Sequence, residues 1–210
     1  MLRATALAGI SILTVSVACA QNGENPSNSP TLAVYMDFDT APVGNSLEVM
    51  QREVDKLLKP AGVTVNWRLV RENHGDETHS RLVVLKFIGA CRADWSVQTR
   101  GDDGAAVGDT QVAEGRVLPF SEVRCDVVRQ ALSYLAPASS KEQRQEALGL
   151  AMGRVVAHEL YHVLARTTSH AEKGLAKASQ TLRDLISKQS ITFAAHDTEA
   201  IRKGFETQTN

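Results

Sequence analysis

Apolar residues recur along the first half of this chain at strand-like and helix-like spacings. Residues 31–38, 63–70 and 81–89 are rich in β-branched and aromatic residues, which predicts three strands. Between the first two, apolar residues of the stretch 47–58 repeat every three or four positions until Pro60, which predicts a helix. This strand–helix–strand order favours a right-handed parallel crossover. The third strand is the most apolar and is expected to be central.

The middle of the chain predicts a hairpin or edge strand and then a long helix. Residues 100–115 are punctuated by glycines and residues 116–123 contain Pro119, which suits a hairpin or an edge strand rather than a central strand. A short helix is expected over residues 125–135. A long helix is expected from residue 141 to about 165. Its apolar side chains between Leu148 and Leu164 leave almost no solvated face, which predicts that this part is buried in the core.

The remaining segments are shorter. Residues 178–188 and 196–205 are expected to form helices, with an extended piece at 191–194. Capping boxes, Asn45 with Glu48 and Ser139 with Glu142, mark the starts of the first helix and the longest helix. The pattern therefore predicts a single α+β domain. It should contain a mixed twisted sheet with a helix crossover and an edge strand, a long buried helix, and a small helical C-terminal part.

The N-terminal region predicts an export signal in front of this domain. Arg3 precedes a largely apolar run, and Ala18-Cys19-Ala20 has the small-x-small pattern of a cleavage site. We therefore expect a signal peptide at residues 1–20, a flexible linker at 21–30 and the single domain at 31–210. The chain should be exported, to a periplasm or out of the cell. No apolar run is long enough to predict a membrane span.

Lipid attachment at Cys19 is the less favoured alternative to cleavage, because Ser16 is a poor residue three places before a lipidated cysteine.

Composition and charge narrow the class of partner. Loss of the signal removes only Arg3 from the charged residues and leaves 22 basic against 24 acidic residues. A nearly balanced charge does not suggest a nucleic acid or an anionic membrane as partner.

Cys91 and Cys125 remain after removal of the signal. Each stands beside a strand-like run, and two cysteines in an exported protein most simply form one disulfide. Metal binding by these two cysteines is the weaker alternative, because they are far apart in sequence and lack CxxC spacing.

The strongest chemical signal is His158-Glu159-Leu160-Tyr161-His162, an HExxH motif within the long helix. Residues four apart lie on one face of a helix, so both histidines can direct a ring nitrogen at one zinc ion. Glu159 is placed to act as a general base on a water activated by that zinc. The alternative is a hydrogen-bonded core cluster without metal, but two histidines and a carboxylate are costly to bury unsatisfied.

Catalytic zinc usually has three protein ligands. His170, just beyond the expected helix end, is the favoured third ligand, with Glu172 and Asp184 as alternatives. Auxiliary ligation by the loop histidines His74 and His79 is disfavoured, because surface histidines are far commoner than ligands. The pair Asp102-Asp103 could bind calcium, although acidic pairs in loops are usually only solvated.

These residues resemble the zincin metallopeptidases. A histidine soon after HExxH points towards the metzincins within that group, and the order of predicted elements is similar to the family's N-terminal part. The chain also resembles small exported bacterial proteins with HELYH, a downstream histidine and a two-cysteine edge region. The resemblance implies a zincin-like fold, zinc bound by His158, His162 and His170, catalysis by Glu159, and a peptide or protein substrate.

The chain departs from the metzincin pattern HExxHxxGxxH at three points. Ala165 stands at the glycine position, Thr168 stands at the third histidine position, and no methionine follows the motif. The missing methionine, together with the lack of an assignable carboxylate to support the ligands, keeps open a non-catalytic, zinc-stabilised binding module of the cell envelope, in which four protein ligands would close the site. A third reading, an amidase acting on cell-wall peptides, keeps the chemistry and changes the substrate.

Overall fold

The computed structural model describes residues 31–73, 75, 78–79, 81–94, 106–135, 139–187, 189 and 191–207. Its strands are β1 (Thr31–Thr40), β2 (Thr64–Leu69), β3 (Leu82–Ala90), β4 (Gly108–Ala113) and β5 (Arg116–Arg124). Its α-helices are α1 (Ser46–Leu58), α2 (Cys125–Leu135), α3 (Lys141–Ala165), α4 (Leu182–Ile186) and α5 (Ala195–Glu206). Two short 3-10 helices, Lys59–Ala61 and Val70–Glu72, flank β2.

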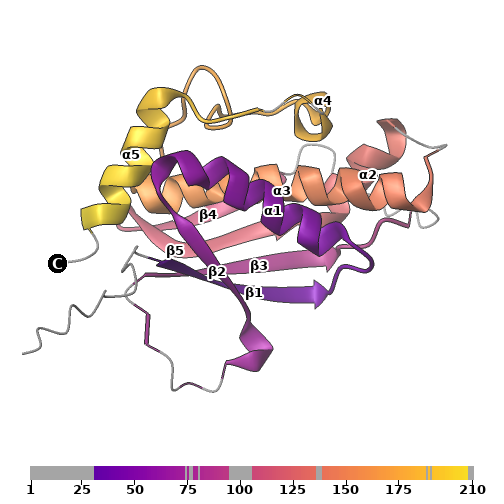
Figure 1. The fold of residues 1–210 in the computed structure, drawn as a ribbon, viewed down its shortest axis with the longest axis horizontal. Helices are drawn as coiled ribbons and strands as arrows, with labels where there is room; N and C mark the ends of the chain where they lie inside the picture. Colours follow the sequence, from indigo (N-terminus) through magenta and orange to yellow (C-terminus); the bar gives the residue numbers. More distant parts are fainter. Residues whose placement is uncertain are drawn as a thin grey trace, which may run out of the picture.

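The five strands form one mixed sheet in the order β2-β1-β3-β5-β4. β1 pairs in parallel with β2 and β3, β3 pairs in parallel with β5, and only β4 runs antiparallel to its neighbour. Helices α1 and α3 lie side by side over one face of this sheet (Figure 1). The predicted α+β class, the parallel pairing around the first helix and the internal position of β3 are confirmed.

The predicted hairpin is present as β4 and β5. Glu114 and Gly115 form its two-residue loop, and both have positive φ angles, 52° and 73°. Two consecutive positive φ angles are typical of the tight turns whose twist matches the flanking strands.

The expectation that residues 116–123 avoid a central position was wrong, since β5 lies between β3 and β4. The pairing of β4 with β5 shifts between Thr110↔Ser121 and Val112↔Val117, so Pro119 lies inside this irregularity. Pairing with β3 begins one residue later, at Phe120. A proline has no N–H to donate, and a bulge is where an internal strand can tolerate one.

Helix α3 lies in the core, as its apolar pattern predicts, and two glycines allow α1 to cross it closely. A Cβ atom at Gly149 would lie 2.6 Å from the Ser46 carbonyl oxygen, and one at Gly153 would lie 2.9 Å from the Met50 carbonyl oxygen. Because these glycines are four residues apart, they lie on one face of α3. Gly153 stands five residues before His158, so the close crossing of α1 lies next to the start of the motif.

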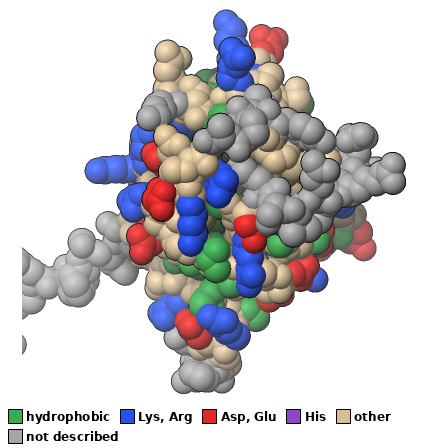
Figure 2. All heavy atoms as spheres, turned by 90° about the vertical axis from the view of Figure 1, so that its right-hand side faces the viewer, with side chains coloured by type: hydrophobic (Ala, Val, Ile, Leu, Met, Phe, Trp, Pro, Cys, Tyr) green, Lys and Arg blue, Asp and Glu red, His purple; other side chains and the backbone are tan. Residues whose placement is uncertain are grey.

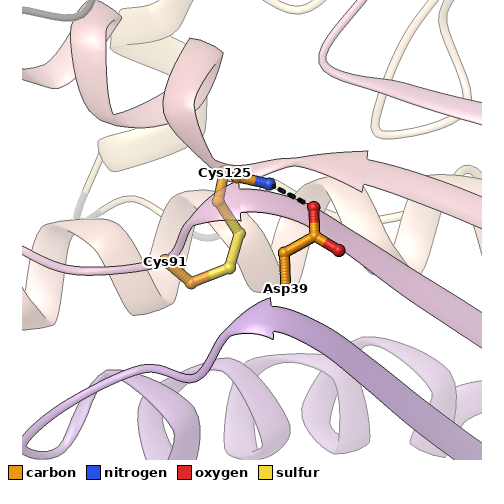
Figure 3. The surroundings of a disulfide bond; sticks show 4 residues. Asp39, Cys91 and Cys125 are labelled. Carbon is orange, nitrogen blue, oxygen red and sulfur yellow. Dashed lines mark hydrogen bonds between the residues drawn. A yellow bond between two sulfur atoms is a disulfide. The ribbon is translucent and has the colours of Figure 1, made fainter.

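A disulfide ties the sheet to α2. Cys91 and Cys125 are bonded, with Cα atoms 4.8 Å apart, and both side chains are buried. The Asp39 carboxylate lies beside the backbone nitrogen of Cys125 (Figure 3) and accepts a hydrogen bond from Gly89 N–H at 3.0 Å. Asp39 therefore places a negative charge at the start of α2, where the helix dipole favours it. The disulfide matches the sequence prediction.

Several local predictions need correction. Asn45 makes no side-chain cap, and the cap of α3 is Ser140 with Gln143, one residue later than predicted. The helix expected at 178–188 is reduced to Leu182–Ile186. Residues 191–194, expected to be extended, lie outside any helix or strand, and Ala194 has the extended backbone angles φ −69° and ψ 162°.

The signal peptide, the linker, Cys19, His74 and the Asp102-Asp103 pair lie outside the described residues. Within the described part, none of the helices combines the length and the apolar character needed to cross a membrane. At the end of the molecule that lies to the right in Figure 1, basic and acidic side chains are intermixed around a small apolar group (Figure 2).

The close crossing of α1 and α3 gives a stability prediction. Gly153→Leu should lower the free energy of unfolding by about 1–3 kcal/mol, because the added side chain must push against α1. Urea unfolding followed by circular dichroism measures this change. Glu146→Leu, at an exposed position of the same helix, is the control and should change it by less than about 0.5 kcal/mol. Equal stability of the two variants would contradict the described crossing.

Candidate metal centre

His158 and His162 converge within one turn near the C-terminal end of α3. Their Nε2 atoms lie 3.1 Å apart, and their rings meet edge to face with centroids 4.8 Å apart. Two nitrogens held about 2.0–2.1 Å from a tetrahedral zinc would be about 3.3 Å apart. The observed separation is therefore close to that of two ligands on one ion.

The chain reverses direction directly after the helix. Arg166 has a positive φ of 52°, and its N–H reaches back to the carbonyl oxygens of His162 and Val163. This left-handed turn occupies the position that a glycine often takes at a helix C-terminus. In the metzincin pattern the glycine is three residues after the second histidine, whereas here the turn is four residues after it. Ala165 therefore remains the last residue of the helix.

His170 returns to the two motif histidines after this reversal. Its ring centroid lies 5.3 Å from that of His158 and 4.7 Å from that of His162. One ring nitrogen from each of the three histidines falls within a set whose members all lie within 4.8 Å of one another. His170 is exposed, whereas His162 is buried. The structure thus brings together the three histidines that the sequence analysis singled out.

The other candidate ligands lie elsewhere. Glu172 and Asp184 are not part of the histidine group, and Asp184 pairs with Lys177 at 3.1 Å. His79 lies with Tyr35, its Nε2 2.9 Å from the tyrosine hydroxyl oxygen. The cysteines are joined in their disulfide. Among the described residues, His158, His162 and His170 are the group that fits a metal ion.

Two backbone carbonyls determine which nitrogens face the centre. His158 Nδ1 lies 2.8 Å from the Leu175 carbonyl oxygen, and His162 Nδ1 lies 2.7 Å from the Thr167 carbonyl oxygen. A carbonyl oxygen only accepts hydrogen bonds, so Nδ1 is the protonated nitrogen in both rings. Each Nε2 then presents a lone pair to the other. Two facing lone pairs repel unless a cation lies between them.

Burial keeps these imidazoles neutral. It lowers the pKa of His158 to about 4 and lowers the pKa of His162, in each case as the largest cause. The hydrogen bonds to Leu175 and Thr167 act in the opposite direction. Neutral imidazole is the form that ligates a metal ion. The chemistry of this donor set therefore fits zinc.

Glu159 is held by the edge strand rather than by the helix alone. Thr110 Oγ1 donates a hydrogen bond of 2.6 Å to Glu159 Oε2, and a Cβ atom at Gly108 would lie only 2.5 Å from Oε1. Burial raises the pKa of Glu159 to about 7, against the opposing effect of Thr110, and the charge of Asp109 raises it further. A carboxyl group with a pKa near neutrality is suited to exchanging protons with water.

Two cavities meet at Glu159. One of about 300 Å³ is bordered by β4, by Glu159, His162 and His170, and by the turn that follows α3. The other, of about 270 Å³, is bordered by the start of β4, by His158 and Glu159, and by the segment before α4. The carboxylate and the histidine group thus border a cleft between α3 and the edge strand.

The partners that orient the motif could not be predicted from residue type. Thr110 and Gly108 lie in a glycine-punctuated stretch that shows only a hairpin pattern. Leu175 and Thr167 contribute backbone carbonyls, which carry no residue-type signal. For Thr167 a signal did exist, since its place five residues after His162 puts it in the turn that ends the helix.

Comparison with known proteins supports the fold, whereas the chemistry is argued from the residues of the site. No protein-family model matches the chain, and no curated protein matches it. Archaemetzincin from Methanopyrus kandleri is similar in structure. The TM-score is 0.51 at 12% sequence identity, over 87% of this chain and 99% of that chain. At such low identity the likeness shows the fold alone, and it supports the zincin-like fold predicted from the motif.

A second solved structure, the GM1-bound form of the ECX AB5 holotoxin, has a TM-score of 0.46 at 14% identity. The match covers 84% of this chain and 80% of that chain. A likeness at this score carries no argument about the present protein.

The histidine group predicts the outcome of ligand removal. The wild-type chain should bind about one equivalent of zinc, and His158→Ala or His162→Ala should abolish binding. His170→Ala should weaken it by more than about 100-fold, since losing a ligand should exceed the 10–100-fold cost of losing an outer partner. Elemental analysis and competition with a chelator measure these effects.

His196→Ala removes an exposed histidine on α5 and Glu172→Ala removes the rejected acidic candidate, so both should bind zinc like the wild type. Loss of zinc in Glu172→Ala, together with normal binding in His170→Ala, would show that the third ligand is misassigned.

Proposed function

We propose that this protein is a zinc-dependent hydrolase that cleaves peptide bonds, with His158, His162 and His170 as metal ligands and Glu159 as the general base. One observation carries the proposal. A buried carboxylate with a raised pKa adjoins two inward-facing imidazole lone pairs at the edge of an open cleft. Zinc bound there would supply a Lewis acid that polarises the substrate carbonyl group and acidifies water.

Glu159 would take the proton from the attacking water at its Oε1 atom, because Thr110 occupies Oε2. The same carboxyl group would then deliver the proton to the leaving amine as the C–N bond breaks. Burial raises the pKa of Glu159 above that of an exposed glutamate, which suits a carboxyl group that takes up a proton and gives it back. Thr110 holds Oε2, and Oε1, which lies close to Gly108 of β4, is the oxygen left to take the proton.

β4 is suited to hold an extended substrate. It is the edge strand on the cleft side, and within the described residues its strand partner is β5. An edge strand presents unpaired backbone N–H and C=O groups, and an extended peptide can add to them as a further strand. This mode of binding would lay the scissile bond beside Glu159 and supports a peptide or protein substrate.

The alternative, a non-catalytic zinc module, requires a site closed by four protein ligands. Among the described residues, the group that fits a metal contributes three histidines, and its third member is exposed. The arrangement favours an accessible position for substrate and hence the hydrolase. A cell-wall amidase would use the same residues on a different peptide.

We further propose export with cleavage of residues 1–20, a linker at 21–30 and a catalytic domain at 31–210. The disulfide between Cys91 and Cys125 supports this proposal, because disulfides persist in oxidising compartments.

Glu159→Gln tests the catalytic assignment. The amide keeps the shape of the side chain but cannot take a proton, so peptide cleavage should fall by about 10²–10⁴-fold while the zinc content stays that of the wild type. Cleavage of a peptide library by the two proteins, with zinc measured in the same samples, gives the comparison. Undiminished cleavage by Glu159→Gln would refute the mechanism.

Gly108→Ala tests the closeness of β4. The new Cβ atom would collide with the free end of the Glu159 side chain, so the carboxylate moves while the fold and the zinc content are retained. Displacement of a catalytic group by about 1 Å can cost up to 10²-fold, and we expect cleavage to fall by about 10–100-fold. Ala113→Ser, at the exposed far end of the same strand and outside both cavities, is the control and should cleave normally. Normal cleavage by Gly108→Ala would mean that β4 does not position Glu159.

A further inference from the structure

We infer that Gln180 is a positioning residue of the metal centre, because its carboxamide holds the carbonyl group that orients His158. The inference rests on the proposed function, in which His158 Nε2 is a metal ligand. Gln180 lies in the irregular segment between α3 and α4, and its residue type alone gives no reason to connect it with the motif.

The Leu175 carbonyl oxygen accepts two hydrogen bonds. One comes from His158 Nδ1 at 2.8 Å, and the other comes from Gln180 Nε2 at 3.0 Å. The same Nε2 also donates to the Gly174 carbonyl oxygen at 3.0 Å. Each hydrogen of the amide group therefore has its own acceptor, and the carboxamide bridges two successive carbonyls of the loop.

The two motif histidines differ in how their acceptors are fixed. Thr167 N–H donates to the His162 carbonyl oxygen at 3.1 Å while His162 Nδ1 donates to the Thr167 carbonyl oxygen, so this acceptor is fixed within the turn itself. The acceptor of His158 lies 17 residues along the chain. Two features shape the backbone around this acceptor, the Leu175 carbonyl. Gly174 has a left-handed φ, and Leu175 N–H donates a hydrogen bond to the Thr192 carbonyl oxygen. Gln180 supplies the contact on the carbonyl itself.

The observed orientation of the Gln180 carboxamide carries a free-energy cost. Its Oε1 atom is buried and has no hydrogen-bond partner among the described residues. A stranded buried acceptor costs about 1–3 kcal/mol. Rotation of the amide would move the oxygen away, but it would then face two carbonyl oxygens. The two hydrogen bonds from the NH₂ group to the backbone carbonyls thus set the orientation, although Oε1 is left without a partner.

Loss of the NH₂ group should leave His158 less well oriented for a metal ion. Gln180→Leu keeps the approximate volume and removes both donors, and Gln180→Glu replaces them with a carboxylate that repels the carbonyls. Outer partners of a metal-ligating histidine are typically worth 10–100-fold in metal affinity. We expect both variants of the full chain to bind zinc about 10–100-fold more weakly in competition with a chromophoric chelator. Ser179→Ala, at the neighbouring exposed position, should bind zinc like the wild type.

Nuclear magnetic resonance of ¹⁵N-histidine-labelled, metal-free protein distinguishes positioning from a general role in folding. In Gln180→Leu the His158 Nδ1–H signal should shift or broaden, while the His162 Nδ1–H signal stays unchanged because Thr167 still accepts it. Wild-type zinc affinity in both variants, or an unchanged His158 signal, would overturn the inference. If the wild-type chain itself binds no zinc, the proposed function fails, and the His158 signal of the metal-free protein still decides the role of Gln180.

Discussion

Backbone carbonyls of a single loop determine how the motif histidines are used. The HExxH spacing places His158 and His162 on one face of α3, but spacing alone leaves each ring free to rotate or to bind through either nitrogen. Hydrogen bonds to Leu175 and Thr167 fix both rings with Nε2 inward. The same loop carries His170 to the other two rings. One segment thus supplies the orientation of two histidines and the position of the third.

The segment that follows this loop is held in place by a buried arginine of α3. Arg154, one turn before His158 on α3, is buried and pairs with Glu53 of α1 at 3.0 Å. Its guanidinium also donates to the carbonyl oxygens of Asp184 and Ser187, at 2.6 and 2.8 Å. A buried ion pair is stable only when its remaining hydrogen-bonding groups are also satisfied, and these carbonyls satisfy them. Arg154 therefore joins α1, α3 and the α4 segment one helical turn away from His158.

The sequence predicted the elements whose identity depends on apolar periodicity, and it predicted the residues that share one helix face. It predicted α3 and the hairpin because apolar residues and turn-forming glycines indicate buried and turning segments directly. The predicted third histidine also falls beside the other two. It did not predict that β5 is internal, because tolerance of Pro119 depends on a bulge in its pairing with β4. Nor did it predict Thr110 or Gln180, whose roles depend on which loops meet α3 in space.

X-ray absorption at the zinc edge of the purified, zinc-loaded protein tests the central claim most directly. The account predicts three nitrogen ligands with imidazole scattering at about 2.0–2.1 Å and one further light ligand that exchanges with added inhibitor or solvent. Sulfur scattering, four protein ligands with no exchangeable position, or a chain that takes up no zinc would contradict it.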